Sequence, residues 1–130
     1  MLAKIAIERG IPMAETIAGK GAVVHEHPAY VGPMGIEGTD AAKELAEDAD
    51  VVIAVGTRLQ DFTTGSWTTF APETQFININ AARFDARKHR ALPVVGDALE
   101  SLRELDAALG DWICDPARME EARRLYADWN

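Results

Sequence analysis

The chain has 130 residues, 48% of them hydrophobic and 26% charged, a composition typical of one globular domain with its own hydrophobic core. Its formal net charge of -8 argues against binding to nucleic acid or to an anionic membrane, because phosphate groups are bound by clustered Lys and Arg. The single cysteine, Cys114, allows neither an internal disulfide nor a cysteine-cluster metal site. No apolar run approaches the ~18 residues of a membrane span, and no signal-peptide pattern is present, so we expect a cytoplasmic protein.

The first third of the chain predicts a helix, a strand, a long loop and a second helix. Residues 2–9 follow helical spacing, residues 11–16 are expected to form a short strand, and residues 17–38 are rich in Gly and Pro. Thr39 is expected to cap a helix over residues 40–47. A domain of alternating strands and helices normally begins with a strand. Either the first strand lies elsewhere in the topology, or the chain was trimmed within a larger protein, which is the explanation we favour.

Glycines in and around the loop form two patterns. The segment AETIAGKG has the outline of a phosphate-binding P-loop, but Ala14 replaces the first Gly and Gly21 follows the Lys, so we reject that motif. Gly32, Gly35 and Gly38 are spaced by three, which is not a dinucleotide-binding pattern. They favour either a flexible loop or a backbone that passes close to a ligand or a neighbouring domain.

Three histidines are the only candidates for a metal site or for stand-alone catalysis. His25 and His27 flank a glutamate in the loop, and a third ligand such as Asp61 or His89 would have to come from elsewhere. Polar surface residues are the simpler interpretation of this pair. We therefore expect no metal site and no catalytic group in this chain, and keep a small enzyme using His25, His27 and Asp61 as the third alternative.

The most apolar segment lies at the middle of the chain. Residues 51–55, VVIAV, are short and β-branched, which predicts a strand buried on both faces of a parallel sheet. The strand ends at Gly56 and is followed by polar residues. Open α/β sheets bind ligands at the carboxyl ends of their strands, so Gly56, Thr57 and Arg58 are the candidate cofactor-binding residues.

The strand predicted over residues 75–80 brings Asn80 to the same crevice. The segment 81–91 after it holds the only basic cluster of the chain, which is either a solvated helix or turn, or a contact for an anionic ligand or a subunit. A short strand over residues 92–96 contains Pro93 and is expected at or near a sheet edge.

Two helices complete the chain. Asp97 is expected to begin a helix that ends at Gly110, and Asp115 to cap a helix from Pro116 to about Asp128. Strands therefore alternate with helices. This pattern predicts an α/β domain of three layers, Rossmann-like, with a mostly parallel sheet and helices on both faces.

Several segments, in order along the chain, resemble the central domain of thiamine-diphosphate-dependent enzymes of the acetolactate synthase and pyruvate decarboxylase superfamily. They are IPMAETIAGKG, GPMGIEGTDAAKELAEDADVVIAVGTRLQDFTTG, FININ and LPVVGDALESLREL. The resemblance implies an NAD/FAD-binding-type Rossmann-like domain over residues 1–112 that lacks its first strand. Residues 113–130 would follow as a linker or docking helix.

Within this superfamily, GTRLQDFTTGSW, FININ and KHRALPVVGDA are most similar to the trihydroxycyclohexanedione hydrolases of myo-inositol catabolism, sometimes labelled malonic semialdehyde decarboxylases. The resemblance implies that the full-length enzyme hydrolyses a C–C bond of a cyclic dione with thiamine diphosphate and Mg²⁺. Both would lie between two flanking catalytic domains that the chain lacks. The fragment is therefore expected to hold no cofactor, to be inactive alone, and to pack against those domains in a homo-oligomer.

The alternative hypothesis is an independent nucleotide- or dinucleotide-binding module. In some relatives the Arg of the G-x-R turn faces a nucleotide, and Arg58 matches that position, with Thr57 and residues 83–90 beside it. Asn80 stands where an acidic ribose-binding residue is expected, a departure from the family pattern.

A domain separated from its neighbours should expose apolar side chains of its former interfaces, and self-association would follow. The candidates for such side chains are Trp67, Phe70, Trp112 and Trp129.

Overall fold

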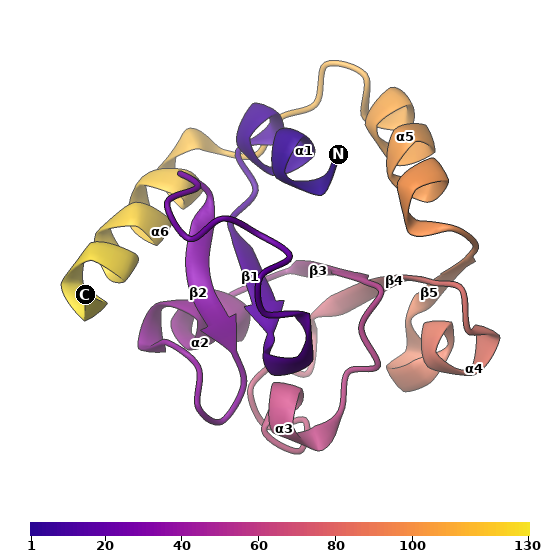
Figure 1. Cartoon of the computed structure of the whole chain (residues 1–130), viewed down its shortest axis with the longest axis horizontal. Coiled ribbons are helices and arrows are strands. Elements are labelled where there is room, and N and C mark those ends of the chain that lie inside the picture. The colour runs from indigo at the N-terminus through magenta and orange to yellow at the C-terminus, as the bar shows by residue number, and fades with distance from the viewer.

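The structure, a computed structural model, describes all 130 residues. Figure 1 shows strands in a middle layer, with helices above and below them. The helices are α1 (Leu2–Arg9), α2 (Asp40–Glu47), α3 (Asp61–Thr64), α4 (Arg83–Ala86), α5 (Ala98–Leu109) and α6 (Pro116–Trp129). The strands are β1 (Met13–Thr16), β2 (Tyr30–Met34), β3 (Val51–Val55), β4 (Gln75–Asn80) and β5 (Leu92–Val95).

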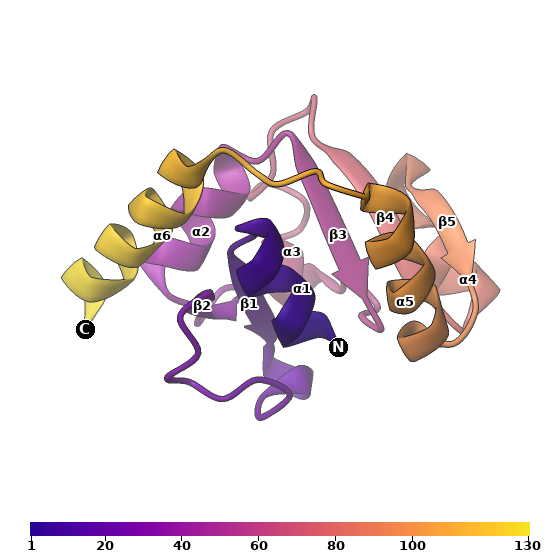
Figure 2. The same cartoon turned by 90° about the horizontal axis from the view of Figure 1, so that it is seen from above.

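All strand pairs are parallel, as expected, but the strands form two sheets. One sheet has the order β1-β2 and the other has the order β3-β4-β5. β3 and β4 pair without a shift from Val51↔Gln75 to Val55↔Ile79. Figures 1 and 2 place β1 between β2 and β3, with α1 lying over the space between the two sheets.

Helices cover both faces of the larger sheet, which confirms the three-layer α/β fold. On one face, Ile79 of β4 packs against Ile5 of α1 and Leu102 of α5. On the other face, Ala54 of β3 and Phe76 of β4 pack with Leu59 from the loop after β3. The two faces therefore hold separate small apolar clusters, and α1 is the helix that contacts both sheets.

Side-chain caps fix where the longer helices begin. Thr39 Oγ1 accepts a hydrogen bond from the Ala42 N–H at 3.0 Å, and Asp97 Oδ1 accepts from the N–H groups of Leu99 and Glu100. Asp115 caps α6 in the same way, ahead of a Pro at the start of the helix. These are the caps that the sequence predicts, because Ser, Thr and Asp satisfy the free N–H groups of a first turn.

Two expectations about the strands were wrong. The expected loop over residues 17–38 contains β2, and all of its residues except Pro33 are buried. Gly32 and Pro33 hide this strand from a pattern search, since both are unfavourable in strand interiors. β3, expected to be buried on both faces, has only Ala54 buried, and Val51 is 45% exposed. β3 is an edge strand of its sheet, and β4 is the central strand.

The C-terminal helix α6 is docked against α2 and β2. Ala122 is fully buried in a cluster with Val31, Met34 and Leu45, and Met119 is buried against α1 and β1. The Tyr126 ring lies edge-on to that of Tyr30 at a centroid distance of 5.8 Å. None of the six helices has the length and apolarity required to cross a lipid bilayer.

Candidate functional site

The carboxyl ends of β3 and β4 bring the predicted site residues together. The Gly56 N–H donates to the Ile79 carbonyl at 2.8 Å, so the loop leaves β3 while still bonded to β4. Gly56 has φ 64°, a left-handed conformation that a side chain would strain. Asn80 Nδ2 donates to the Thr57 carbonyl at 3.1 Å, and its Oδ1 accepts from the Ala82 N–H. Asn80 therefore holds this loop in place instead of facing an open crevice.

The basic cluster after β4 folds back onto the same loop. Lys88 Nζ donates to the Arg58 carbonyl at 2.9 Å and pairs with Asp85 at 2.8 Å. The Arg58 side chain is 68% exposed, with its Nε 4.0 Å from Asp85. The structure thus joins Arg58 to the segment 83–90, as the nucleotide-binding alternative requires. The Asp85 carboxylate already neutralises part of this positive charge.

Backbone strain gathers around this loop. The chain has five non-glycine residues with positive φ, and all of them lie in or next to it: Leu59, Ser66, Trp67, His89 and Arg90. Leu59 is buried against Trp67 and Phe76, so packing holds the loop in its strained form. Such strain is common at functional sites and is retained only where the surroundings impose it.

His89 lies against the ring of Trp67, with the two planes 30° apart. Burial by this contact lowers the pKa of His89 below its ordinary value of 6.5, and the nearby Lys88 charge lowers it further, while Asp61 acts in the opposite direction. The imidazole is therefore held neutral near pH 7. It packs on an aromatic ring and occupies no position from which it could serve as a metal ligand together with His25 and His27.

The other histidines lie in the 17–29 loop and are not part of this site. His25 is 76% exposed in its side chain and pairs with Glu26, and His27 Nδ1 accepts from the Ala29 N–H. No three His, Cys, Asp or Glu side chains come together in a way that could hold a metal ion. The structure does not assemble His25, His27 and Asp61 into the site of a small enzyme.

The three loop glycines have a role inside the domain. At Gly35, with φ 127°, a Cβ atom would lie 2.6 Å from the Phe62 carbonyl, and the Ile36 N–H donates to that carbonyl. The close approach that the sequence suggested is therefore to the α3 backbone and not to a ligand. It ties the loop after β2 to the loop after β3.

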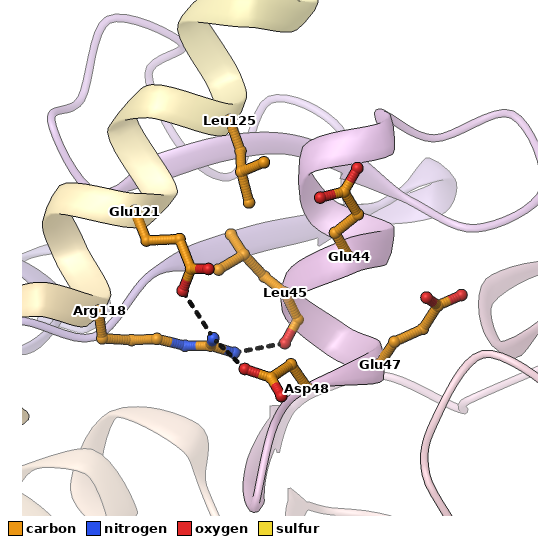
Figure 3. A pocket seen from close by; sticks show the side chains of 7 residues that line it. All are labelled: Glu44, Leu45, Glu47, Asp48, Arg118, Glu121 and Leu125. Carbon is orange, nitrogen blue, oxygen red and sulfur yellow. Dashed lines mark hydrogen bonds and ion pairs between the residues drawn. The ribbon is translucent and has the colours of Figure 1, made fainter.

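A surface pocket lies between α2 and α6 (Figure 3). Arg118 extends across it and donates to the Leu45 carbonyl at 2.6 Å, while its guanidinium also pairs with Asp48 and Glu121 at 3.1 Å. The other polar lining residues, Glu44 and Glu47, are acidic. Arg118 thus uses its charge on groups of the domain itself, and its contacts with α2 help to fix α6 on α2.

Sequence reasoning missed one buried polar pair. Glu15 on β1 is 8% exposed and accepts hydrogen bonds from the Tyr30 hydroxyl at 2.7 Å and from the Gly21 N–H at 2.9 Å. Burial, and then the neighbouring carboxylate, raise the pKa of Tyr30 above its ordinary range. The alternation of β1 places Glu15 on the same side as buried Met13, which was the available signal. The pair anchors the 17–29 loop to the smaller sheet.

Two of the four predicted interface aromatics are exposed. Trp112 is 49% and Trp129 is 48% exposed. Trp67 and Phe70 are partly buried instead, because both rings pack on Phe76 with centroid distances of 5.3 and 4.9 Å. For these two residues the expectation of an exposed interface was wrong.

Comparison with known proteins decides the family. The model of the family described as "Thiamine pyrophosphate enzyme, central domain" matches residues 1–105. The chain belongs to this family. The matched residues include β1 to β5, the G-T-R loop after β3 and the basic segment after β4, and the match confirms the resemblance seen in the sequence.

Three curated relatives of this central domain are named 3D-(3,5/4)-trihydroxycyclohexane-1,2-dione hydrolase. The relative from Clostridium perfringens is 45% identical over 109 residues, which are 83% of this chain and 17% of the relative. The one from Geobacillus thermodenitrificans is 43% identical over 127 residues, 98% of this chain and 19% of the relative. A Listeria monocytogenes relative is 49% identical over 98 residues, 75% of this chain and 15% of the relative. The chain therefore spans less than a fifth of the length of these relatives.

Proposed function

We propose that this chain is the non-catalytic central domain of a thiamine-diphosphate-dependent enzyme that hydrolyses a C–C bond of a cyclic trihydroxy-dione. The observation that supports the proposal is its identity of 43–49% with hydrolases of that name, over a region that is a small part of each of them. Its role would be to pack the catalytic domains together and to help form a homo-oligomer in the cytoplasm.

The residues of this chain do not fit thiamine diphosphate and its divalent metal. A diphosphate–metal group requires several carboxylate or carbonyl oxygens around the cation and unengaged donors around the phosphates. No group of acidic or histidine side chains meets the first requirement. At the strand ends, Lys88 is engaged by Asp85 and by the Arg58 carbonyl. The cofactor and Mg²⁺ would therefore be held by the flanking domains, and no catalytic step is assigned to this chain.

As part of the same proposal, we place a domain boundary after residue 112. α6 would be a docking helix that leads toward the next domain, and the exposed Trp112 and Trp129 would lie at contacts with neighbouring domains or subunits. Apolar side chains of this size on a surface are typical of such contacts.

Turnover assays test the proposal directly. The purified chain, given thiamine diphosphate, Mg²⁺ and trihydroxycyclohexane-1,2-dione, is expected to show no ring opening above the uncatalysed rate. Ring opening by the chain alone, abolished by a substitution in the chain itself, would overturn the assignment of a non-catalytic role. The Clostridium perfringens hydrolase serves as the positive control in the same assay.

We also propose a second function for the loop Gly56–Thr57–Arg58, which is contact with an anionic group of a nucleotide. It is supported by the exposed Arg58 guanidinium beside the ends of two parallel strands.

Thermal denaturation with ADP, FAD or NAD measures this second function, because a ligand that binds only the folded state raises its stability. If the loop binds a nucleotide, one of the three will raise the melting temperature of the native chain and of Arg103→Ala, an exposed control on α5 outside the basic segment. Arg58→Ala is expected to lose that rise. A melting temperature that stays flat up to millimolar concentrations of all three ligands would remove nucleotide binding.

A further inference from the structure

The connection between α5 and α6, residues 110–115, carries two large apolar side chains on the surface. Trp112 is 49% and Ile113 is 58% exposed. Burial of an exposed tryptophan is among the largest contributions that one side chain makes to an interface. Figures 1 and 2 show this connection passing from α5 past α1 to α6.

Arg9, at the end of α1, holds the backbone of this connection. Its guanidinium donates to the carbonyls of Gly110 and Trp112, to the second at 3.0 Å. The Cys114 N–H donates to the Arg9 carbonyl at 2.8 Å. An ion pair with Asp106 of α5, at 2.6 Å, fixes the Arg9 side chain, which is only 14% exposed. The two apolar side chains are therefore displayed on a fixed backbone, which lowers the entropic cost of binding a partner.

A groove with a volume of about 420 Å³ lies next to these side chains, between α1 and the start of α6. Its apolar lining includes Ile7, Ile113 and Met119, and Ile7 is 37% exposed. Its volume falls within the ~300–1,000 Å³ of clefts that bind small molecules, so it is large enough for one indole ring. Ile113, which is part of the wall, directly follows Trp112 in the chain. The exposed tryptophan and the groove therefore lie next to each other on one face of the molecule.

The rim of the groove carries charges of both signs. Glu120 and Arg123 line it from α6, and both are exposed. The ion pairs of α6 are made by Arg118 and Arg124 instead, and Arg123 is held only by a hydrogen bond of 3.3 Å to the Pro28 carbonyl. Both rim charges are therefore free to pair with a neighbouring molecule. In a two-fold arrangement, Glu120 of each copy would face Arg123 of the other, and the pair would occur twice.

We propose that this face binds a second copy of the chain in a two-fold symmetric dimer, in which Trp112 of each copy enters the groove of the other. A surface that carries both the inserted side chain and the groove that receives it is complementary to itself, which is the requirement of an isologous contact. The mixed charges of Glu120 and Arg123 favour the same occupant over a uniformly acidic or basic partner. The dimer would be the subunit contact that the proposed function assigns to Trp112, so it rests on that part of the proposed function.

Sedimentation equilibrium of the purified chain tests the proposal. We expect a monomer–dimer equilibrium between ~1 μM and ~1 mM that saturates at the dimer, because an isologous contact is closed. Trp112→Ser removes the inserted side chain and Ile7→Glu places a carboxylate in the groove, so each should weaken the dimer at least ~10-fold. Trp129→Ser is the matched control. Trp129 is 48% exposed but lies about 20 Å from Pro116 along α6, so its loss should leave the dissociation constant unchanged.

The indole N–H signals in NMR spectra give a second measurement, which needs no substitution. On dilution the Trp112 signal should move with the fraction of dimer, whereas the Trp129 signal should stay in place. A chain that stays monomeric up to ~1 mM, or that associates beyond the dimer, would overturn the proposal. So would a dimer that is weakened equally by Trp112→Ser and Trp129→Ser, or one that is unaffected by both Trp112→Ser and Ile7→Glu. Neither measurement involves turnover, so a failure of the dimer and a failure of the hydrolase role are distinguishable.

Discussion

At the scale of single residues, the loop after β3 is held by side-chain hydrogen bonds and by an ion pair within the domain. Asn80 and Lys88 bond to backbone carbonyls of Thr57 and Arg58, and Asp85 binds Lys88. A polar pattern at a strand end predicted the place of these residues. It could not predict that most of their hydrogen-bonding capacity is used within the domain, because that depends on how the segment after β4 folds back.

His89 provides a residue-scale prediction. Its pKa is lowered mainly by burial against Trp67 and secondly by Lys88. We expect the NMR titration of His89 to have its midpoint below 6.5, and to move upward in Trp67→Leu and, by less, in Lys88→Met. A midpoint that is unaffected by both substitutions would contradict the assigned causes.

The same shift gives the sign of a pH effect on stability. A folded-state pKa below 6.5 means that the unfolded chain binds a proton more readily than the folded chain between the two pKa values. The contribution of His89 is therefore fully present above pH 6.5 and is lost as the pH falls toward the folded-state pKa. Urea denaturation of the native chain and of His89→Asn should show a smaller loss between neutral and mildly acidic pH in the variant. An identical pH dependence in both would contradict this sign.

At the scale of elements, some helices and strands could be predicted from local sequence signals, whereas others depend on tertiary contacts. α2 and β4 were predicted with their observed bounds, because a capping Thr and an alternating apolar strand are signals within a few residues. β2 was missed because its pairing with β1 and its burial under α2 override the Gly and Pro in its sequence. The exposure of β3 depends on whether a strand pairs with its edge opposite β4. No local sequence pattern indicates this.

The cap of α2 allows a quantitative test. The Thr39 hydroxyl accepts from the Ala42 N–H and donates to the Val31 carbonyl at 2.6 Å, and the residue is 1% exposed. Thr39→Val keeps the shape and removes both hydrogen bonds, so the free energy of unfolding should fall by about 1–3 kcal/mol. Thr39→Ser keeps the hydroxyl and should lose less than the valine variant. Equal losses in urea denaturation would show that packing, not the cap, is the dominant contribution.

The docking of α6 gives a second element-scale test. Ala122 is fully buried between α6 and the cluster of Val31 and Leu45, so Ala122→Leu should overpack it and lower the free energy of unfolding by about 1–3 kcal/mol. Arg124→Leu is the matched control on the exposed face of α6, where a change within about 0.5 kcal/mol is expected. Similar small effects of both variants would show that α6 is not docked in solution.

At the scale of the whole molecule, the family match and the split of the sheet both agree with the proposed role of this chain as a central domain. The chain matches a central domain, spans less than a fifth of its relatives, and contains apolar β3 with an unpaired edge. Order and type of the segments were enough to recognise the superfamily from sequence. The division into two sheets was not predictable, because strand order is set by long-range pairing.

We propose that this chain serves as the structural central domain of a trihydroxycyclohexanedione hydrolase. The most direct measurement is turnover by a chimera, in which this chain replaces the matched 127-residue region of the Geobacillus thermodenitrificans relative. We expect the chimera to open the dione ring with a kcat within about 10-fold of the parent, a change of ~1.4 kcal/mol at most in the barrier. A chimera that folds, assembles and binds thiamine diphosphate as the parent does, yet shows no turnover, would contradict the claim.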